Sequence, residues 1–208
     1  MKNFLMLNNR KIELTPEQVK QIENSFDFNK VLLKDIEVGE TFKVGTLEFI
    51  VLEHVMTDDN KNVTYVLLKD FWKTTKFDSS FNNYKESEIR KDLNNNFYNE
   101  LSGIVGTDNI VEHTVYLAAD DGRTDYGHCE DNISLLTCEM YRKYVYVLEK
   151  YNPKKWWWLA TAYSTKSNGY ETSVRCVDSS GTLSSINRGS SGGVRPFCIL
   201  KSNIFVSK

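Results

Sequence analysis

Histidine and cysteine most often act as nucleophiles, proton carriers or metal ligands, and in this chain they are few and widely spaced. The histidines are at positions 54, 113 and 128, and the cysteines at 129, 138, 176 and 198. The sequence contains no CxxC pair and no G-x-S-x-G, H-E-x-x-H, P-loop or G-x-G-x-x-G motif. We therefore predict no catalytic residue, no metal ligand and no cofactor. Buried, reduced cysteines are favoured over a metal site built from His128, Cys129 and Cys138.

An acidic, glycine-containing loop at residues 118–131 is a second place where chemistry could occur. It carries Asp120, Asp121 and Asp125, and carboxylates are the oxygen ligands that calcium prefers. The spacing lacks the alternating acids and the terminal glutamate of an EF-hand. The sequence therefore favours a solvated loop over a calcium site.

A polar stretch at residues 160–193 has the composition of a recognition surface. It is rich in Tyr, Ser, Gly and Asn with an occasional Arg, the mixture found in adaptable binding loops. Tyrosine offers a large contact area at low entropic cost, and arginine can bind anions through two hydrogen bonds. The candidate ligand-binding residues are Tyr163, Asn168, Tyr170, Arg175, Asn187 and Arg188. The alternative, that these are ordinary solvated turns, stays open.

These loops must be held by the strands on either side of them. Trp156, Trp157 and Trp158 precede the polar stretch, and Gly192-Gly193-Val194-Arg195-Pro196-Phe197 follows it. Successive side chains of a strand point to opposite faces, so the three tryptophans cannot share one layer. In residues 171–178 the same alternation separates Val174 and Cys176 from Arg175 and Val177. We assign Arg195 a structural role, with its guanidinium bonded to loop carbonyls.

Two amphipathic helices are predicted further upstream. Ser87 is the N-cap of the first, whose apolar residues recur every four positions at 89, 93, 97 and 101, and Gly103 can end it. The polar residues between them, at 90–92 and 94–96, are expected to form a solvated face. Thr137 is the N-cap of the second, which ends before Asn152-Pro153. Strands are predicted at 42–55, with a break at Gly45, and at 63–68, 111–117, 171–178, 182–186 and 194–200. Residues 70–84 are expected to be an irregular segment anchored by its aromatic side chains.

Residues 1–27 form a separate predicted appendage, and residues 28–208 the main domain. Two short strands around Asn8-Asn9 suggest a hairpin, and Thr15-Pro16-Glu17-Gln18 is a strong helix start with a capping box. A short hairpin and a short helix are marginally stable alone. We therefore expect this unit to dock on the main domain or on another chain, so an oligomer formed through residues 1–27 is possible.

Composition narrows the class of protein. Apolar residues make up 40% and charged residues 26%, as is usual for a globular protein, and the net charge is −2. A weakly acidic chain is a poor candidate for general nucleic-acid binding. The sequence lacks an apolar run of the ~20 residues that span a membrane. Its first residues make a poor signal peptide, so we expect a location in the cytoplasm of a host cell or in a virion.

Several of these segments together resemble a bacterial and phage domain of unknown function. That family's approximate signature is W-W-L-R-S-P, then V-x-x-x-G, then G-V-R-P. The matching segments are Trp157-Trp158-Leu159, Val174 to Asp178 with Gly181, Gly193-Val194-Arg195-Pro196, the helix start Ser87 to Asn94, and Leu135 to Tyr141. The resemblance covers roughly residues 30–204. It departs at Ala160-Thr161-Ala162, which replaces Arg-Ser-Pro, so loop geometry or ligand chemistry can differ here.

The family is similar in its terminal pattern to C-type-lectin-like folds, which include formylglycine-generating-enzyme-like domains and receptor-binding tips of some phages. The resemblance implies an α+β fold of this type, with a mixed, mainly antiparallel sheet, two helices and long irregular loops. It also implies that ligands bind on the loop-rich face.

Three hypotheses about function follow. The first is a non-catalytic binding module, phage- or prophage-encoded, that recognises a protein or glycan through the 160–193 loops. The second is an intracellular inhibitor of a host defence factor. The third is an enzyme related to formylglycine-generating enzymes that uses Cys176 or Cys198, although both cysteines lie in strand-like segments where burial is expected.

Overall fold

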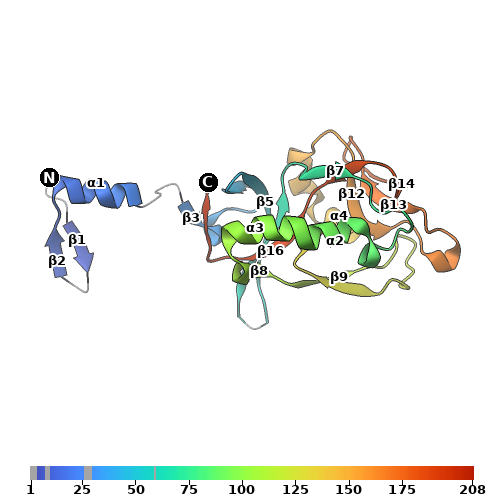
Figure 1. The fold of residues 1–208 in the computed structure, drawn as a ribbon, viewed down its shortest axis with the longest axis horizontal. Helices are drawn as coiled ribbons and strands as arrows, with labels where there is room; N and C mark the ends of the chain where they lie inside the picture. Colours follow the sequence, from blue (N-terminus) through green and yellow to red (C-terminus); the bar gives the residue numbers. More distant parts are fainter. Residues whose placement is uncertain (1–3, 8–9, 26–29, 59) are drawn as a thin grey trace.

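Residues 30–208 form two mainly antiparallel sheets with helices packed against them, in the computed structural model of the chain (Figure 1). The structure describes residues 4–7, 10–25, 30–58 and 60–208, and the side chains of residues 10–20, 30–58 and 60–208. The fold is therefore of the mixed α+β class, as the sequence predicted.

The larger sheet has eight strands and is built around the β5–β6 hairpin. Its main path runs β11 (Ile133–Ser134), β16 (Phe197–Lys201), β6 (Asn62–Leu68), β5 (Leu47–Met56), β4 (Thr41–Val44), β17 (Phe205–Ser207) and β3 (Lys30–Leu32). β8 (Ile110–Val111) also pairs with β16. The predicted strand at 42–55 is divided in two, because the chain turns at Gly45, where φ is +59°.

The smaller sheet has five strands and carries the polar stretch. Its order is β14 (Leu183–Asn187), β13 (Ser173–Val177), β12 (Trp157–Ala162), β15 (Gly192–Val194) and β7 (Lys73–Thr75). The pairing of β12 with β15 is parallel, and the other pairings are antiparallel. A separate hairpin joins β9 (His113–Tyr116) to β10 (His128–Asp131), so the end of the predicted acidic loop is a strand.

Both sheets bury side chains on both faces, which divides the interior into two apolar clusters. In β5, Val51 lies in one cluster and Ile50 in the other; in β12, Trp158 and Trp157 are divided in the same way. The predicted separation of neighbouring tryptophans is confirmed, because side chains alternate along a strand.

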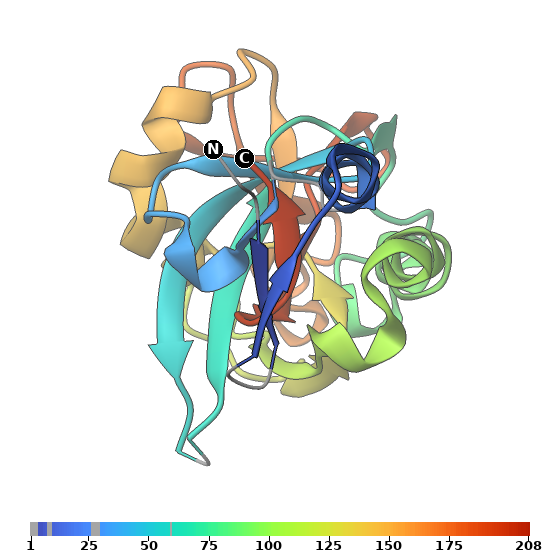
Figure 2. The same cartoon turned by 90° about the vertical axis from the view of Figure 1, so that its left-hand side faces the viewer.

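Helices cover the two faces. On one side, α2 (Glu88–Asp92), a π-helical segment (Leu93–Phe97) and α3 (Tyr98–Val105) form a continuous helical rod, and on the other lies α4 (Cys138–Leu148). Figure 2 shows the rod and α4 on opposite sides of the strands. The apolar residues of the rod belong to the cluster of Trp158, and those of α4 to the cluster of Trp157. Ser87 and Thr137 cap these helices as predicted, accepting hydrogen bonds from the amides of Arg90 and Met140.

Two details of the rod differ from the sequence prediction. The helix passes through Gly103 and ends at Gly106, whose φ of +84° is a conformation that glycine adopts most easily. Asn94 was expected on a solvated face, but its side chain donates to the carbonyl of Ile133 at 2.8 Å and accepts from the amides of Asn132 and Ile133. These bonds attach the π-helical segment to β11.

The tryptophans and the Gly192–Pro196 segment interlock as one structural unit. A side chain on Gly192 would collide with the ring of Trp156, and one on Gly193 with the ring of Phe71. Arg195 is 1% exposed, donates to the carbonyl of Leu68 at 3.0 Å and lies 4.9 Å from the centre of the Trp157 ring. Its predicted structural role is confirmed, although the bonded carbonyl belongs to the last residue of β6 and not to a loop. Burial lowers the pKa of Arg195 to about 10.

The N-terminal residues form the predicted hairpin and helix. β1 (Phe4–Leu7) pairs with β2 (Arg10–Glu13), and α1 (Pro16–Ser25) follows. The capping box is present: the amide of Gln18 donates to Thr15 Oγ1, and the amide of Thr15 to Gln18 Oε1. All described side chains from 10 to 20 are exposed or half-buried, so none is buried against the main domain. Asn8 and Asn9, which the prediction also used, lie outside the described residues.

Candidate binding site

The polar stretch places two exposed tyrosines on the loop between β12 and β13. Tyr163 is 43% exposed and Tyr170 53% exposed, and their ring centres are 6.2 Å apart. Figure 1 shows this loop at the end of the domain remote from β3 and β17. Two large exposed aromatic rings this close together form a contact surface of the kind that recognition loops use.

Asn82 fixes the backbone of this loop from below. Its side chain is fully buried, and its Nδ2 lies within hydrogen-bond distance of the carbonyl oxygens of Ser164, Tyr170 and Ser173, at 2.9, 2.9 and 2.8 Å. Three positions of the loop, of which the first follows Tyr163 directly and the second is Tyr170 itself, are therefore tied to one amide group. A buried carbonyl that lacked such a hydrogen-bond partner would lower the stability of the fold.

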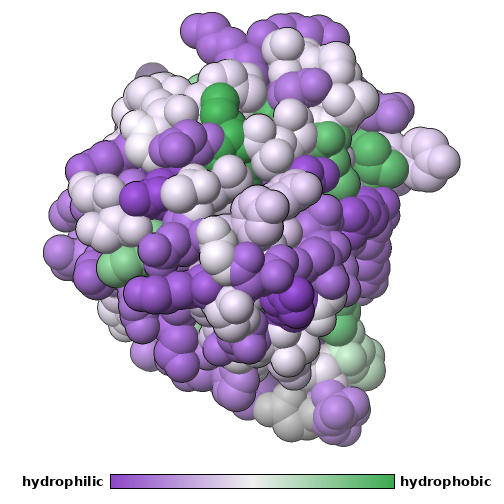
Figure 3. All heavy atoms as spheres, turned by 90° about the vertical axis from the view of Figure 1, so that its right-hand side faces the viewer, coloured by the Kyte–Doolittle hydropathy of each residue, from purple (hydrophilic) through white to green (hydrophobic). Residues whose placement is uncertain are grey.

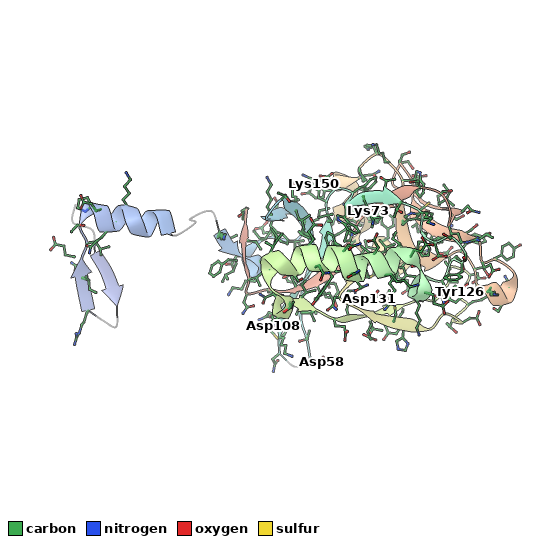
Figure 4. All side chains as sticks on the ribbon, viewed as in Figure 1. Asp58, Lys73, Asp108, Tyr126, Asp131 and Lys150 are labelled. Carbon is green, nitrogen blue, oxygen red and sulfur yellow. The ribbon has the colours of Figure 1, made fainter. Side chains whose placement is uncertain are left out.

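Tyr126 completes this network. It belongs to the acidic segment, which is the predicted acidic loop at residues 118–131. Its hydroxyl donates to Asn82 Oδ1 at 2.7 Å and accepts from the amide of Lys166 at 3.0 Å. Figure 4 places Tyr126 at the same end of the domain as the loop. Burial raises the pKa of Tyr126, so the hydroxyl stays protonated and keeps donating at neutral pH.

Carboxylates of the acidic segment hold the loop through its hydroxyl groups. Asp121 accepts from Ser164 Oγ at 2.6 Å, and Asp125 accepts from Thr165 Oγ1 and Ser167 Oγ at 2.5 and 2.7 Å. These hydrogen bonds lower the pKa of both aspartates. The expectation of a merely solvated loop is therefore wrong in one respect, because this segment braces the neighbouring loop. Within the described residues, no group of three or more His, Cys, Asp or Glu side chains could hold a metal ion.

The end of β14 also lies beside the loop between β12 and β13. Asn187 pairs with Ser173, and the amide of Arg188 donates to the carbonyl of Thr172 at 2.9 Å. Asn187 is exposed, but its Oδ1 accepts from the amide of Gly189 and so shapes its own turn. Arg188 is half-buried, and its buried Nε has no hydrogen-bond partner among the described residues.

Two of the predicted residues are more constrained than expected. Arg175 has a side chain that is 13% exposed, with its Nε 3.5 Å from Asp120, so it helps to position the acidic segment. Asn168 is exposed but donates to Ser164 Oγ at 3.2 Å. Tyr163 and Tyr170 are thus the two large side chains among the predicted residues that are exposed.

The residues that organise the site were not among the candidates. Asn82 contacts positions 82 to 91 residues further along the chain, and Tyr126 contacts Asn82 from 44 residues away. Asn82 belongs to the segment predicted to be irregular, and nothing in its immediate neighbours marks it as buried. Asparagine is rarely found in protein interiors, so the residue type by itself predicts an exposed side chain.

The cysteines of the enzyme hypothesis lie in the interior. Cys176 is 3% exposed and Cys198 is fully buried. Burial raises the pKa of Cys176 to about 11 and that of Cys198 further still. A thiol reacts as its thiolate, so neither residue has the environment of a nucleophile.

The face that carries the loop is mainly hydrophilic, with small apolar areas (Figure 3). An interface on such a face would rely on hydrogen bonds and aromatic contacts rather than on a large apolar patch. No helix in the described residues is long and apolar enough to cross a membrane.

Comparisons with known proteins give a family but no activity. No curated protein and no solved structure matches the chain. The sequence profile of the domain of unknown function DUF6273 matches residues 61–202, which is more than half of the 208 residues. This segment holds both tyrosines, Asn82 and the acidic segment. The chain is therefore a member of the DUF6273 family.

Proposed function

We propose that this domain is a non-catalytic binding module that recognises a protein or a glycan through the 160–193 loops. The observation that carries the proposal is the tethering of the Tyr163–Tyr170 loop by the buried Asn82 side chain. A loop that is ordered before it meets its ligand loses less conformational entropy on binding. Ordinary solvated turns have no need of a buried amide within hydrogen-bond distance of three of their carbonyls.

The chemistry of the surface is compatible with both classes of ligand. Tyrosine rings stack on the C–H faces of sugars and also fill interface pockets on proteins, with the hydroxyl left to hydrogen-bond. Asn168, Asn187 and Arg188 would supply hydrogen bonds around the rings. Arg175 would act indirectly, by holding Asp120.

The finer features of the sequence resemblance belong to the same proposal. They are a C-type-lectin-like arrangement of the two sheets, a phage or prophage origin, and a location in the host cytoplasm or in a virion. The mainly antiparallel sheets and the position of the 163–170 loop at one end of the domain support the first of these features. Genes for tail proteins beside this one would support a receptor-binding role, and a cluster of early or anti-defence genes an intracellular one.

A double variant tests the proposed surface. Tyr163→Ala with Tyr170→Ala removes both exposed rings without opening the core, so Tm should stay unchanged. Captured partners from candidate host lysates, identified by mass spectrometry, and signals on a glycan array should both be lost. Tyr146→Ala is the matched control, because Tyr146 is 87% exposed on α4, away from the loop. Equal capture and array signals for wild type and the double variant would refute the proposal.

A further inference from the structure

A second concave site lies between β9 and α4, outside the loops discussed above. It encloses about 230 Å³, and the side chains that matter here are Tyr65, Tyr116, Tyr144, Phe197, Met140 and Ile199. A cavity of about 150 Å³ is already large enough to bind benzene in another protein. This pocket is therefore large enough for a compact organic group.

Aromatic rings dominate its wall. Phe197 is fully buried, and the edges of Tyr65 and His113 meet it at centroid distances of 5.7 and 5.2 Å. Tyr144 is 6% exposed, whereas Tyr116 is 71% exposed at the opening. Several rings around one small space create a region of negative quadrupole potential wherever a ring face is presented.

The charges around the pocket are mainly negative. Glu139 lines it and is exposed, with no ion-pair partner among the described residues. Glu53 accepts from the hydroxyl of Tyr144 at 2.6 Å, and Glu130 accepts from Thr114 on the pocket wall at 2.8 Å. Against these carboxylates stand two basic side chains, Lys143 and His113.

Neither basic side chain gives the pocket a net positive charge. The Lys143 ammonium is 2.7 Å from Glu53, which neutralises it, and 5.1 Å from the centre of the Tyr144 ring. A cation therefore already lies near one ring of this wall. Burial lowers the pKa of His113 to about 4, so the imidazole is neutral at pH 7.

We propose that this pocket binds an alkylated ammonium group, such as a trimethylammonium, within a wall of aromatic rings and beside Glu139. Such a cation has an apolar surface that suits the rings and carries no N–H donor that would need a buried acceptor. Aromatic faces attract it through their quadrupole, and quaternary ammonium recognition is a common use of this interaction.

Choline and its uncharged isostere 3,3-dimethylbutan-1-ol are the test probes for the intact protein. They have the same shape and differ in the charge at the branched end. Titration followed by the NMR signals of Thr114, Tyr116 and Lys143 should give a Kd for choline about tenfold lower than for the isostere, as expected for a cation–π contribution of ordinary size. The anion 3,3-dimethylbutanoate, which keeps the same branched end, should bind more weakly than either.

Two variants at the accessible edge locate the binding. Tyr116→Ala removes one ring and should weaken choline binding about fivefold, and Glu139→Gln removes the unpaired carboxylate and should weaken it about threefold. Tyr146→Ala and Glu149→Gln are controls on exposed residues outside the pocket, and both should leave the Kd unchanged.

Three results would overturn the proposal. One is the absence of saturable choline shifts at these residues at millimolar probe. Another is equal affinity for choline and 3,3-dimethylbutan-1-ol, which would mean a pocket selective only for apolar bulk. The third is unchanged choline affinity in both Tyr116→Ala and Glu139→Gln.

Discussion

At the scale of single residues, Asn82 contributes most to the candidate binding site. Its amide meets three carbonyls and one hydroxyl in a fully buried position. Replacing it with alanine removes the side-chain partner of the Ser164 and Tyr170 carbonyls and of the Tyr126 hydroxyl, so Asn82→Ala should lower the free energy of unfolding by about 3 kcal/mol. Urea denaturation measures this loss.

An exposed asparagine provides the comparison for this prediction. Asn95 lies on the solvent side of the helical rod, and Asn95→Ala should change the free energy of unfolding by less than about 0.5 kcal/mol. If Asn82→Ala is as mild as Asn95→Ala, the buried network is not what holds the loop.

Gly193 is a residue at which a single added methyl group should destabilise the fold. Its position faces the ring of Phe71, so Gly193→Ala should overpack the junction of the two sheets and cost about 2 kcal/mol. Gly103→Ala adds the same methyl group to a helix where nothing lies within 4 Å, and it should stabilise by about 1 kcal/mol. Thermal unfolding of the two variants should therefore shift Tm in opposite directions, and a shift of the same sign would contradict this account of the Gly-Gly pair.

At the scale of elements, the acidic segment should make the site sensitive to acid. The pKa values of Asp121 and Asp125 are lowered by hydrogen bonds to loop hydroxyls. As the pH falls, the unfolded chain takes up these protons first, so the stabilisation present above about pH 4 is lost below it. In Asp121→Asn with Asp125→Asn this part of the pH dependence disappears. Tm measured from pH 7 to pH 3 should fall less in the double variant than in wild type, and parallel curves would show that these bonds add no stability.

The helical rod buries apolar side chains that recur every four residues, a spacing that does not match the 3.6 residues per turn of an α-helix. Ile89, Leu93, Phe97 and Leu101 are all buried, as their spacing predicted. In an α-helix, however, a strict four-residue repeat turns about 40° per step away from one face. The π-helical segment at Leu93–Phe97 has wider turns, which reduces this drift and keeps the four residues directed at one cluster.

At the scale of the whole molecule, the segment that the family profile matches and the segment that folds as one unit have different boundaries. The match begins at residue 61, within the turn between β5 and β6. The preceding strand β5 nevertheless lies in the middle of the larger sheet, and Phe49, Ile50 and Val51 are fully buried. β3 and β17 pair with each other although they lie at opposite ends of the domain sequence. The folding unit therefore extends from β3 to β17.

The N-terminal unit should be separable from this folding unit. Its described side chains from 10 to 20 are exposed or half-buried, so removal of residues 1–27 should leave the Tm of the main domain unchanged. If the unit joins chains, light scattering after gel filtration should show an oligomer for the full chain and a monomer for the truncated one. A truncated chain that keeps the larger mass would place the contact elsewhere, and a lower Tm would show that the unit supports the domain.

The sequence by itself determined the features that depend on near neighbours in the chain. Helix caps at Thr15, Ser87 and Thr137 and the alternation at Trp157 and Trp158 were predictable, because a cap bonds within its own turn and a strand alternates at every residue. The four-residue repeat identified the rod but placed its end at Gly103, since only backbone geometry distinguishes that glycine from Gly106.

Only the tertiary structure decided where the polar network lies. The hydrogen bonds that join Asn82, Tyr126 and the 163–170 loop each span 40 or more residues of the chain, and Asn94 leaves its expected solvated face to bond β11. The same is true of Arg175, whose sequence context suits a ligand contact but whose partner proves to be Asp120. Whether a polar side chain is solvated or buried depends on which other segment lies opposite it, and no short stretch of sequence contains that information.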